Sequence, residues 1–255
     1  MIDGSWAFVL AAAFAAGLVD AMAGGGGLIQ LPALLAAWPA APLANLLGTN
    51  KLASLCGTLS AGLQYAVRVP IPWAIVGPGL VIAALSASAG AWTVTRLSPE
   101  VLRPLVPLLL VAVLAYTLLR PALGTEHAPR KLDRMTQVTG AVGIALIGFY
   151  DGFFGPGTGS FLMLLLVRVF GFDFLHAAAG ARLLNVATNA AALAWFGTRT
   201  EVLVVLGLAM AACNVAGAQV GTRLALRHGT RFVRGAFLIV VTGLVARTAW
   251  QAWRG

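Results

Sequence analysis

A hydrophobic segment that carries one carboxylate and then breaks at glycines occurs twice in the sequence. Residues 17–32 read GLVDAMAGGGGLIQLP, and residues 148–163, which lie 131 positions later, read GFYDGFFGPGTGSFLM. Asp20 and Asp151 fall at the same place in the two copies. Because glycine loses the most backbone entropy in a helix and readily adopts positive φ, we expect an apolar helix to open at each glycine run.

The same offset, without a gap, also aligns Lys51 with Arg182. We therefore interpret the chain as a tandem duplication, in which repeat 1 covers residues 1–125, a polar loop covers 126–136 and repeat 2 covers 137–255. Each repeat is predicted to contain about five apolar segments, the second of which is short. The whole chain would then hold eight long spans and two short broken-helix segments.

Composition identifies the surroundings of these segments. Hydrophobic residues make up 60% of the chain and charged residues 10%, whereas a soluble domain has about a quarter charged residues. Most of the chain is therefore predicted to lie in lipid, where backbone groups form their hydrogen bonds within helices. The predicted fold class is an all-α integral membrane protein. The net charge of +9 arises from basic residues between apolar segments, which set membrane orientation, and nucleic-acid binding is not expected.

Loop charges bear on how the two repeats are oriented. If the short segments, at about 28–38 and 160–171, cross the membrane, most basic loop residues lie on one side and repeat 2 is inverted relative to repeat 1. If these segments dip in and return, the basic residues divide almost evenly and the repeats are parallel. The positive-inside rule favours inverted repeats with both termini outside. Inverted repeats that contain broken helices recur in secondary transporters.

The third apolar segment of each repeat carries one cation and two hydrogen-bonding side chains on one helix face. These residues are Lys51, Ser54 and Thr58 in repeat 1, and Arg182, Asn185 and Asn189 in repeat 2. A cation in lipid costs about 3 kcal/mol or more, so each must face the protein interior and find an anionic partner. Helices that begin after the glycine runs also offer free N–H groups and positive dipole ends to an anion. The candidate substrate-binding residues are Lys51, Arg182, Asn50, Thr49, Ser54, Asn185, Asn189, Gly25, Gly26, Gly27, Gly157, Thr158 and Gly159.

Two interpretations of the buried cations remain open at this stage. In the first, Lys51 pairs with Asp20 or Asp151, Arg182 takes the other carboxylate, and the four side chains hold the repeats together. In the second, the cations bind an anionic substrate. Asp20 and Asp151 are also candidates for proton coupling, because carboxyl groups in a low dielectric can take up protons. No metal or cofactor is expected, since Cys56 and Cys213 lie inside apolar segments without metal-ligand spacing.

The runs LIQLP, LLGTNKLASLCGT, GFYDGFFGPGTGSFLM and GARLLNVATN together resemble the TauE/SafE family of membrane transporters, in particular its YfcA-like branch. The resemblance covers nearly the whole chain, and its signature segments fall at residues 24–27, 48–52, 155–159 and 182–185. It implies a multi-pass carrier of the bacterial inner membrane that moves sulfur-containing anions such as sulfite, thiosulfate or organosulfonates. Repeat 2 departs from repeat 1 in lacking a proline at its copy of position 32, so the two half-sites need not be equivalent.

The predicted function is secondary transport of small anions by alternating access. Two pseudo-symmetric halves would rock around an anion held between Lys51, Arg182 and the glycine-loop amides. An anion channel is the main alternative, because the same cations could line a pore. An intramembrane aspartyl protease fits less well, since the glycine-x-glycine-aspartate arrangement of such enzymes is absent, and the protein is not expected to be an enzyme. The expected partners are a small anion and the lipid bilayer, and a homo-oligomer remains an option.

Overall fold

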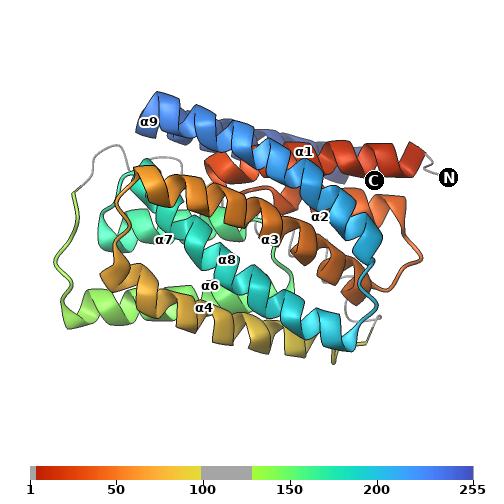
Figure 1. The fold of residues 1–255 in the computed structure, drawn as a ribbon, viewed down its shortest axis with the longest axis horizontal. Helices are drawn as coiled ribbons and strands as arrows, with labels where there is room; N and C mark the ends of the chain where they lie inside the picture. Colours follow the sequence, from red (N-terminus) through yellow and green to blue (C-terminus); the bar gives the residue numbers. More distant parts are fainter. Residues whose placement is uncertain (1–3, 99–127, 255) are drawn as a thin grey trace.

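The computed structural model describes residues 4–98 and 128–254, and this part of the chain is helical throughout, with no strand (Figure 1). Its eight helices are α1 (Gly4–Ala23), α2 (Gly27–Ala37), α3 (Leu43–Arg68), α4 (Trp73–Val94), α6 (Arg134–Phe153), α7 (Thr158–Phe170), α8 (Phe174–Arg199) and α9 (Val204–Arg254). The prediction of an all-α fold is confirmed for these residues. The last of the five apolar segments predicted for repeat 1, at about residues 101–119, lies outside the described residues.

Within residues 4–98 and 128–254, three helical stretches are long and apolar enough to cross a membrane, namely Ser5–Ala23, Trp73–Val94 and Val204–Gly229. Large hydrophobic side chains such as Leu85 on α4 and Leu146 on α6 are more than 65% exposed on the outside of the bundle, where lipid would solvate them. The apolar helices α2 and α7 have 11 and 13 residues. Their length of about 16–20 Å is shorter than a bilayer core of about 30 Å.

Both glycine runs interrupt a helix, as the sequence predicts. The chain leaves the helical conformation at residues 24–26 between α1 and α2, and at 154–157 between α6 and α7. Gly24 has a φ of 83° and Gly155 a φ of 99°, a left-handed conformation in which a Cβ atom is unfavourable. These two glycines occupy equivalent positions at the offset of 131 residues.

The two helix breaks cross one another at the centre of the protein. Ser160, in the first turn of α7, donates its backbone N–H to the carbonyl oxygen of Gly24 at 3.1 Å. Its hydroxyl donates to the carbonyl oxygen of Ala23 at 2.8 Å. A Cβ atom on Gly24 would overlap the backbone of Gly159. Backbone groups that the breaks expose within the membrane thus find partners in the opposite break.

Four helices pair across the two halves of the chain. Helix α1 lies along α9 on one side of the bundle, α4 lies along α6 on the opposite side, and α3 and α8 cross between them (Figure 1). Cβ atoms on Gly17 or Gly217 would overlap backbone carbonyl groups across the α1–α9 contact, and Cβ atoms on Gly90 or Gly152 would do so across the α4–α6 contact. Small residues at both contacts therefore let the helix backbones touch.

Helix bounds follow the same offset as the sequence motifs. Helices α3 and α8 each have 26 residues, and α8 begins and ends 131 positions after α3. The start of α9 lies 131 positions after the start of α4. Helix α9 contains a kink at Gly229, where φ is 73° and ψ is −165°. These regularities are consistent with the tandem duplication, which remains a prediction.

Aspartates outside the apolar segments cap two of the helices. The carboxylate of Asp133 accepts a hydrogen bond from the backbone N–H of Thr136 at 2.8 Å at the start of α6, and Asp173 accepts one from His176 N–H at 2.8 Å at the start of α8. Such caps satisfy N–H groups that have no partner within the helix. The Thr136 N–H lowers the pKa of the Asp133 carboxyl below its usual value.

Candidate functional site

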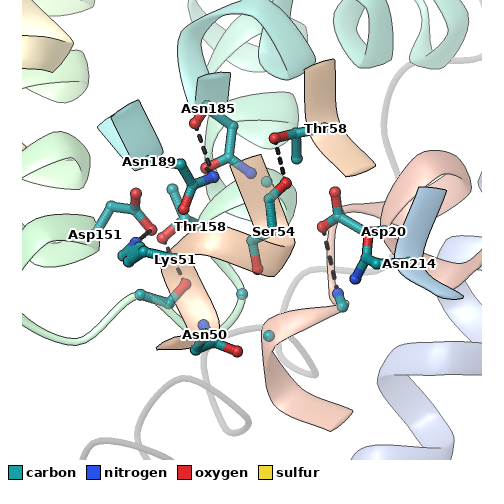
Figure 2. Close-up of a pocket in the computed structure, with 16 residues that line it drawn as sticks. Asp20, Asn50, Lys51, Ser54, Thr58, Asp151, Thr158, Asn185, Asn189 and Asn214 are labelled. Carbon is teal, nitrogen blue, oxygen red and sulfur yellow. Dashed lines mark hydrogen bonds and ion pairs between the residues drawn. The ribbon is translucent and has the colours of Figure 1, made fainter. Parts of the chain in front are cut away.

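A polar cavity lies where the crossed helix breaks meet the middle of α3 and α8 (Figure 2). It has a volume of about 20 Å³, which is room for one or two water molecules. Its walls contain every candidate residue of the sequence prediction, Asp20 and Asp151 included, except Thr49, Gly25 and Arg182. Four further lining residues lie outside that prediction, namely Gly24, Thr58, Gly155 and Asn214.

Lys51 on α3 forms an ion pair with Asp151 on α6. The distance from Nζ to Oδ1 is 2.8 Å, and both side chains are 2% exposed. The second carboxylate oxygen of Asp151 is buried and accepts no hydrogen bond from the described residues. A Cβ atom on Gly155 would lie 2.8 Å from Nζ, so a glycine at the break leaves the space that the lysine amine occupies.

Arg182 on α8 lies next to Asp20 on α1, with Nη1 at 3.6 Å from Oδ2. The guanidinium is fully buried, and none of its three nitrogens donates a hydrogen bond within the described part of the chain. Arg182 is not among the residues that line the cavity, but its guanidinium lies directly behind Gly159, which does line it; a Cβ atom on Gly159 would be 2.6 Å from Nη1. Buried donors without acceptors are costly. The N–H groups of the Arg182 guanidinium are therefore available to donate hydrogen bonds to an anion.

Both ion pairs join one half of the chain to the other. Lys51 and Asp20 come from the first half, and Asp151 and Arg182 come from the second. The pairing therefore corresponds to one of the arrangements in the first interpretation of the cations, with Lys51 on Asp151 and Arg182 on Asp20. The four groups have a formal charge of zero together. An anion that entered this site would leave one negative charge uncompensated unless a proton accompanied it.

Buried amides form two groups at the cavity. Gln30 on α2 connects Asn50 on α3 with Asn214 on α9 through hydrogen bonds of 2.9 and 2.7 Å. On α8, Asn189 donates to the carbonyl oxygen and to the side chain of Asn185 at 2.8 and 3.1 Å. Gln30 and Asn214 are not among the substrate-binding residues predicted from the sequence, although each is a polar residue that could face a cavity. The only signal for them is that each is an isolated amide within an apolar segment.

Thr49 serves a different purpose from the cavity residues. Its hydroxyl donates to the carbonyl oxygen of Asn45 at 2.7 Å and accepts the backbone N–H of Leu203 at 3.0 Å. It thereby fastens the first turns of α3 to the chain that enters α9. Its contacts are those of a packing residue.

The fold and the cavity define a helical membrane protein whose interrupted helices meet at a buried, charge-paired polar site, an arrangement typical of secondary transporters. The chain belongs to the TauE/SafE family. The family model described as "Sulfite exporter TauE/SafE" matches residues 9–248, so membership extends over nearly the whole sequence.

Curated relatives cover the same length of chain. The chain is 40% identical to the probable membrane transporter protein ORF9 of a Sinorhizobium species, over 94% of this chain and 91% of the relative. It is 34% identical to a probable membrane transporter protein of Haemophilus influenzae, over 97% and 96%. It is 35% identical to the probable membrane transporter protein YfcA of Escherichia coli K12, over 94% and 88%. No solved structure matches the chain. The family and these relatives are named as transporters and not as enzymes, which leaves the protease alternative without support.

Proposed function

We propose that the protein is a secondary transporter that moves small anions across the bacterial inner membrane by alternating access. The substrate class we propose is sulfur-containing oxyanions and organosulfonates, because the matching family is described as a sulfite exporter and the relatives come from bacteria. One observation carries the proposal. Two buried cations, one from each half of the chain, meet carboxylates of the opposite half beside a pair of crossed helix breaks.

Anion binding would begin at Lys51, because its amine lines the cavity and Arg182 does not. The substrate would replace the Asp151 carboxylate as the partner of the amine. Donors around this position come from the side-chain amides of Asn50 and Asn185. An oxyanion with four heavy atoms needs more room than the 20 Å³ of the cavity, so the cavity would have to widen on binding, and separation of the Lys51–Asp151 pair would provide space next to the amine.

Charge balance supports coupling to protons. The displaced Asp151 carboxylate would be an unpaired negative charge in a dry site, which costs several kcal/mol, about 3–5 by analogy with broken buried ion pairs. Protonation of Asp151 or Asp20 removes this cost. The electroneutral stoichiometry is then one proton for each monovalent anion. We propose Asp20 and Asp151 as the proton-coupling groups for this reason.

Helix packing suggests which parts move during alternating access. We define bundle 1 as α1, α2, α3 and residues 204–228 of α9, and bundle 2 as α4, α6, α7 and α8. Hydrogen bonds within bundle 1 join Tyr65 to the Ala21 carbonyl and Asn214 to Gln30, and within bundle 2 the Trp195 indole donates to Thr95. Contacts across the boundary between the bundles include the two ion pairs and the two hydrogen bonds that Ser160 donates to Ala23 and Gly24, at the break between α1 and α2.

We therefore propose that bundle 1 rocks against bundle 2 along the α3–α8 contact. Bundle 1 combines α1, α2 and α3 of the first half of the chain with α9 of the second half. Bundle 2 combines α6, α7 and α8 of the second half with α4 of the first half. The glycine-mediated contacts of α1 with α9 and of α4 with α6 support this division, because backbones in direct contact move together. The ion pairs lie at the moving boundary, where substrate could exchange with carboxylate.

Flux measurements on purified protein in proteoliposomes test the proposal against the channel alternative. We expect uptake of radiolabelled sulfite that saturates with concentration and is driven by a proton gradient. Thiosulfate and a small organosulfonate should compete with it, whereas a cation of similar size should not. A rapid, voltage-driven and non-saturating current would instead establish an anion channel, and the absence of any anion flux would refute both.

A further inference from the structure

Gln30 is a fully buried amide that lies behind the cavity wall. It projects from α2, has 0% exposure and does not line the cavity. Its Nε2 lies 3.3 Å from the backbone carbonyl oxygen of Asn50 and 2.9 Å from Asn50 Oδ1, and its Oε1 lies 2.7 Å from Asn214 Nδ2. All four hydrogen-bonding groups belong to bundle 1, so they stay together when the bundles move.

The backbone carbonyl fixes the orientation of every amide in this chain of hydrogen bonds. A carbonyl oxygen can only accept, so the end of the Gln30 amide that faces it must be the NH₂ group. The carbonyl end of Gln30 then faces Asn214, which must donate. Asn50 must present Oδ1 to Gln30, and its own NH₂ group is turned to the other side. That NH₂ group donates no hydrogen bond among the described residues, although Asn50 lines the cavity.

The outward NH₂ group adds two donors next to Lys51, the neighbouring residue on α3. An oxyanion requires donors, and an Asn50 side chain in the reverse orientation would place an acceptor oxygen in the cavity instead. These three amides have no counterparts at the offset of 131 residues. The positions equivalent to Gln30, Asn50 and Asn214 are 161, 181 and 83, and they hold Phe, Ala and Ala. A lysine amine has three donors and an arginine guanidinium five, so the lysine half-site gains most from extra donors.

We propose that Gln30 is a positioning residue that locks the Asn50 amide with its NH₂ group toward the cavity and thereby sets the affinity for the anion. The inference rests on the proposed anion transport. Gln30 itself would touch no substrate. Replacement of Gln30 would change anion affinity only through the orientation of Asn50. A residue that only held α2, α3 and α9 together would not have this effect.

A double-variant cycle on proteoliposome uptake of sulfite tests the inference, with Gln30→Met, Asn50→Ala and the two combined. We expect each single variant to raise KM at least about tenfold, the typical effect of one lost hydrogen bond to a charged group, with kcat changed less than about twofold. The combined variant should have the KM of Asn50→Ala alone. Gln64→Met is the matched control and should leave KM unchanged, because the one hydrogen bond of the Gln64 side chain to the described residues is to the Ser60 carbonyl of its own helix.

The outcomes separate this inference from the proposed function. Independent, multiplying increases in KM would overturn the positioning role and leave anion transport intact. A fall in kcat or in folded protein with unchanged KM would do the same, because it would assign Gln30 to helix packing alone. A wild-type protein that transports no anion would overturn both.

Discussion

Replacing Lys51 and Asp151 singly and together separates a structural ion pair from a transport site. At the observed 2.8 Å and an effective dielectric constant of about 20, the Coulomb attraction is about 6 kcal/mol. The cost of taking both ions out of water cancels most of it. Removal of one partner leaves a buried charge alone and should lower the free energy of unfolding by about 3–5 kcal/mol. Removal of both should cost little.

We therefore expect Lys51→Met and Asp151→Leu each to destabilise the protein, and the combined variant to approach wild-type stability. Unfolding by denaturant in detergent micelles measures the three free energies. Uptake of sulfite in proteoliposomes, normalised to folded protein, should be absent in the two variants that lack Lys51, because the anion has lost its cation. It should also be absent in Asp151→Leu, because that variant lacks a proposed proton-coupling carboxylate. Asp133→Asn is the control, since this carboxylate caps α6 outside the site, and it should transport normally. A combined variant that is stable and transports like wild type would refute the reasoning and leave the pair a purely structural role.

Two further predictions concern the helix breaks and the moving bundles. Gly24→Ala should abolish folding or transport, because position 24 has positive φ and a Cβ atom there would overlap the opposite break. Gly77→Ala is the control and should leave both unchanged, since nothing lies within 4 Å of its Cβ. Thermal unfolding and sulfite uptake measure the two effects, and a Gly24→Ala protein that folds and transports normally would contradict the prediction. A disulfide within bundle 1, between α1 and α9, should permit transport, whereas one between α3 and α8 should block it until reductant is added. Both disulfides join one sequence half to the other, so transport blocked by both would favour the sequence halves as moving bodies. The cysteine pairs are at Ala21 and Gly221, with Cβ atoms 3.1 Å apart, and at Gly48 and Phe196, with Cβ atoms 3.0 Å apart, in a background without Cys56 and Cys213.

The helix breaks were predictable from sequence because they depend on a local property. Glycine at positions 24 and 155 is conformationally permissive whatever surrounds it, and the structure places positive φ at both. The lipid environment followed from composition for a similar reason, since each apolar segment carries that information itself. The grouping of Lys51 with Asn185 and Asn189 at one cavity followed from the helical spacing and the repeat.

The sequence left open which charges pair, because either carboxylate could reach either cation until α3 and α8 are placed. The sequence also led to the prediction that the two halves of the chain move as units, whereas the proposed moving bundles exchange α4 and α9. Helical periodicity identifies the face of a helix that packs, but not the helix that packs against it. The missing signal lies in small residues such as Gly17, Gly90 and Gly152, because a glycine lets the backbones of two helices touch. The sequence predicts that Lys51 and Arg182 together hold the anion; in the fold Lys51 lines the cavity, whereas Arg182 does not and lies next to Asp20.

Gln30 shows a different limit of sequence reasoning. A single amide in an apolar helix is compatible with an ordinary helix–helix hydrogen bond, and only the contact with a backbone carbonyl fixes which way it points. Its partner Asn214 lies 184 residues away along the chain, beyond the reach of any local pattern. Roles of this kind depend on tertiary contacts and become visible only in the fold.

Sulfite uptake by Lys51→Ala and Arg182→Ala proteins tests the central claim most directly, because both cations are proposed to serve the anion and not only the fold. Purified variants would be reconstituted at equal amounts of folded protein, with the exposed Arg168→Ala variant on α7 as the control for loss of an arginine. We expect proton-driven, saturable uptake by wild type and by the control, and none by either of the other two. Wild-type uptake by folded Lys51→Ala or Arg182→Ala protein would contradict the account.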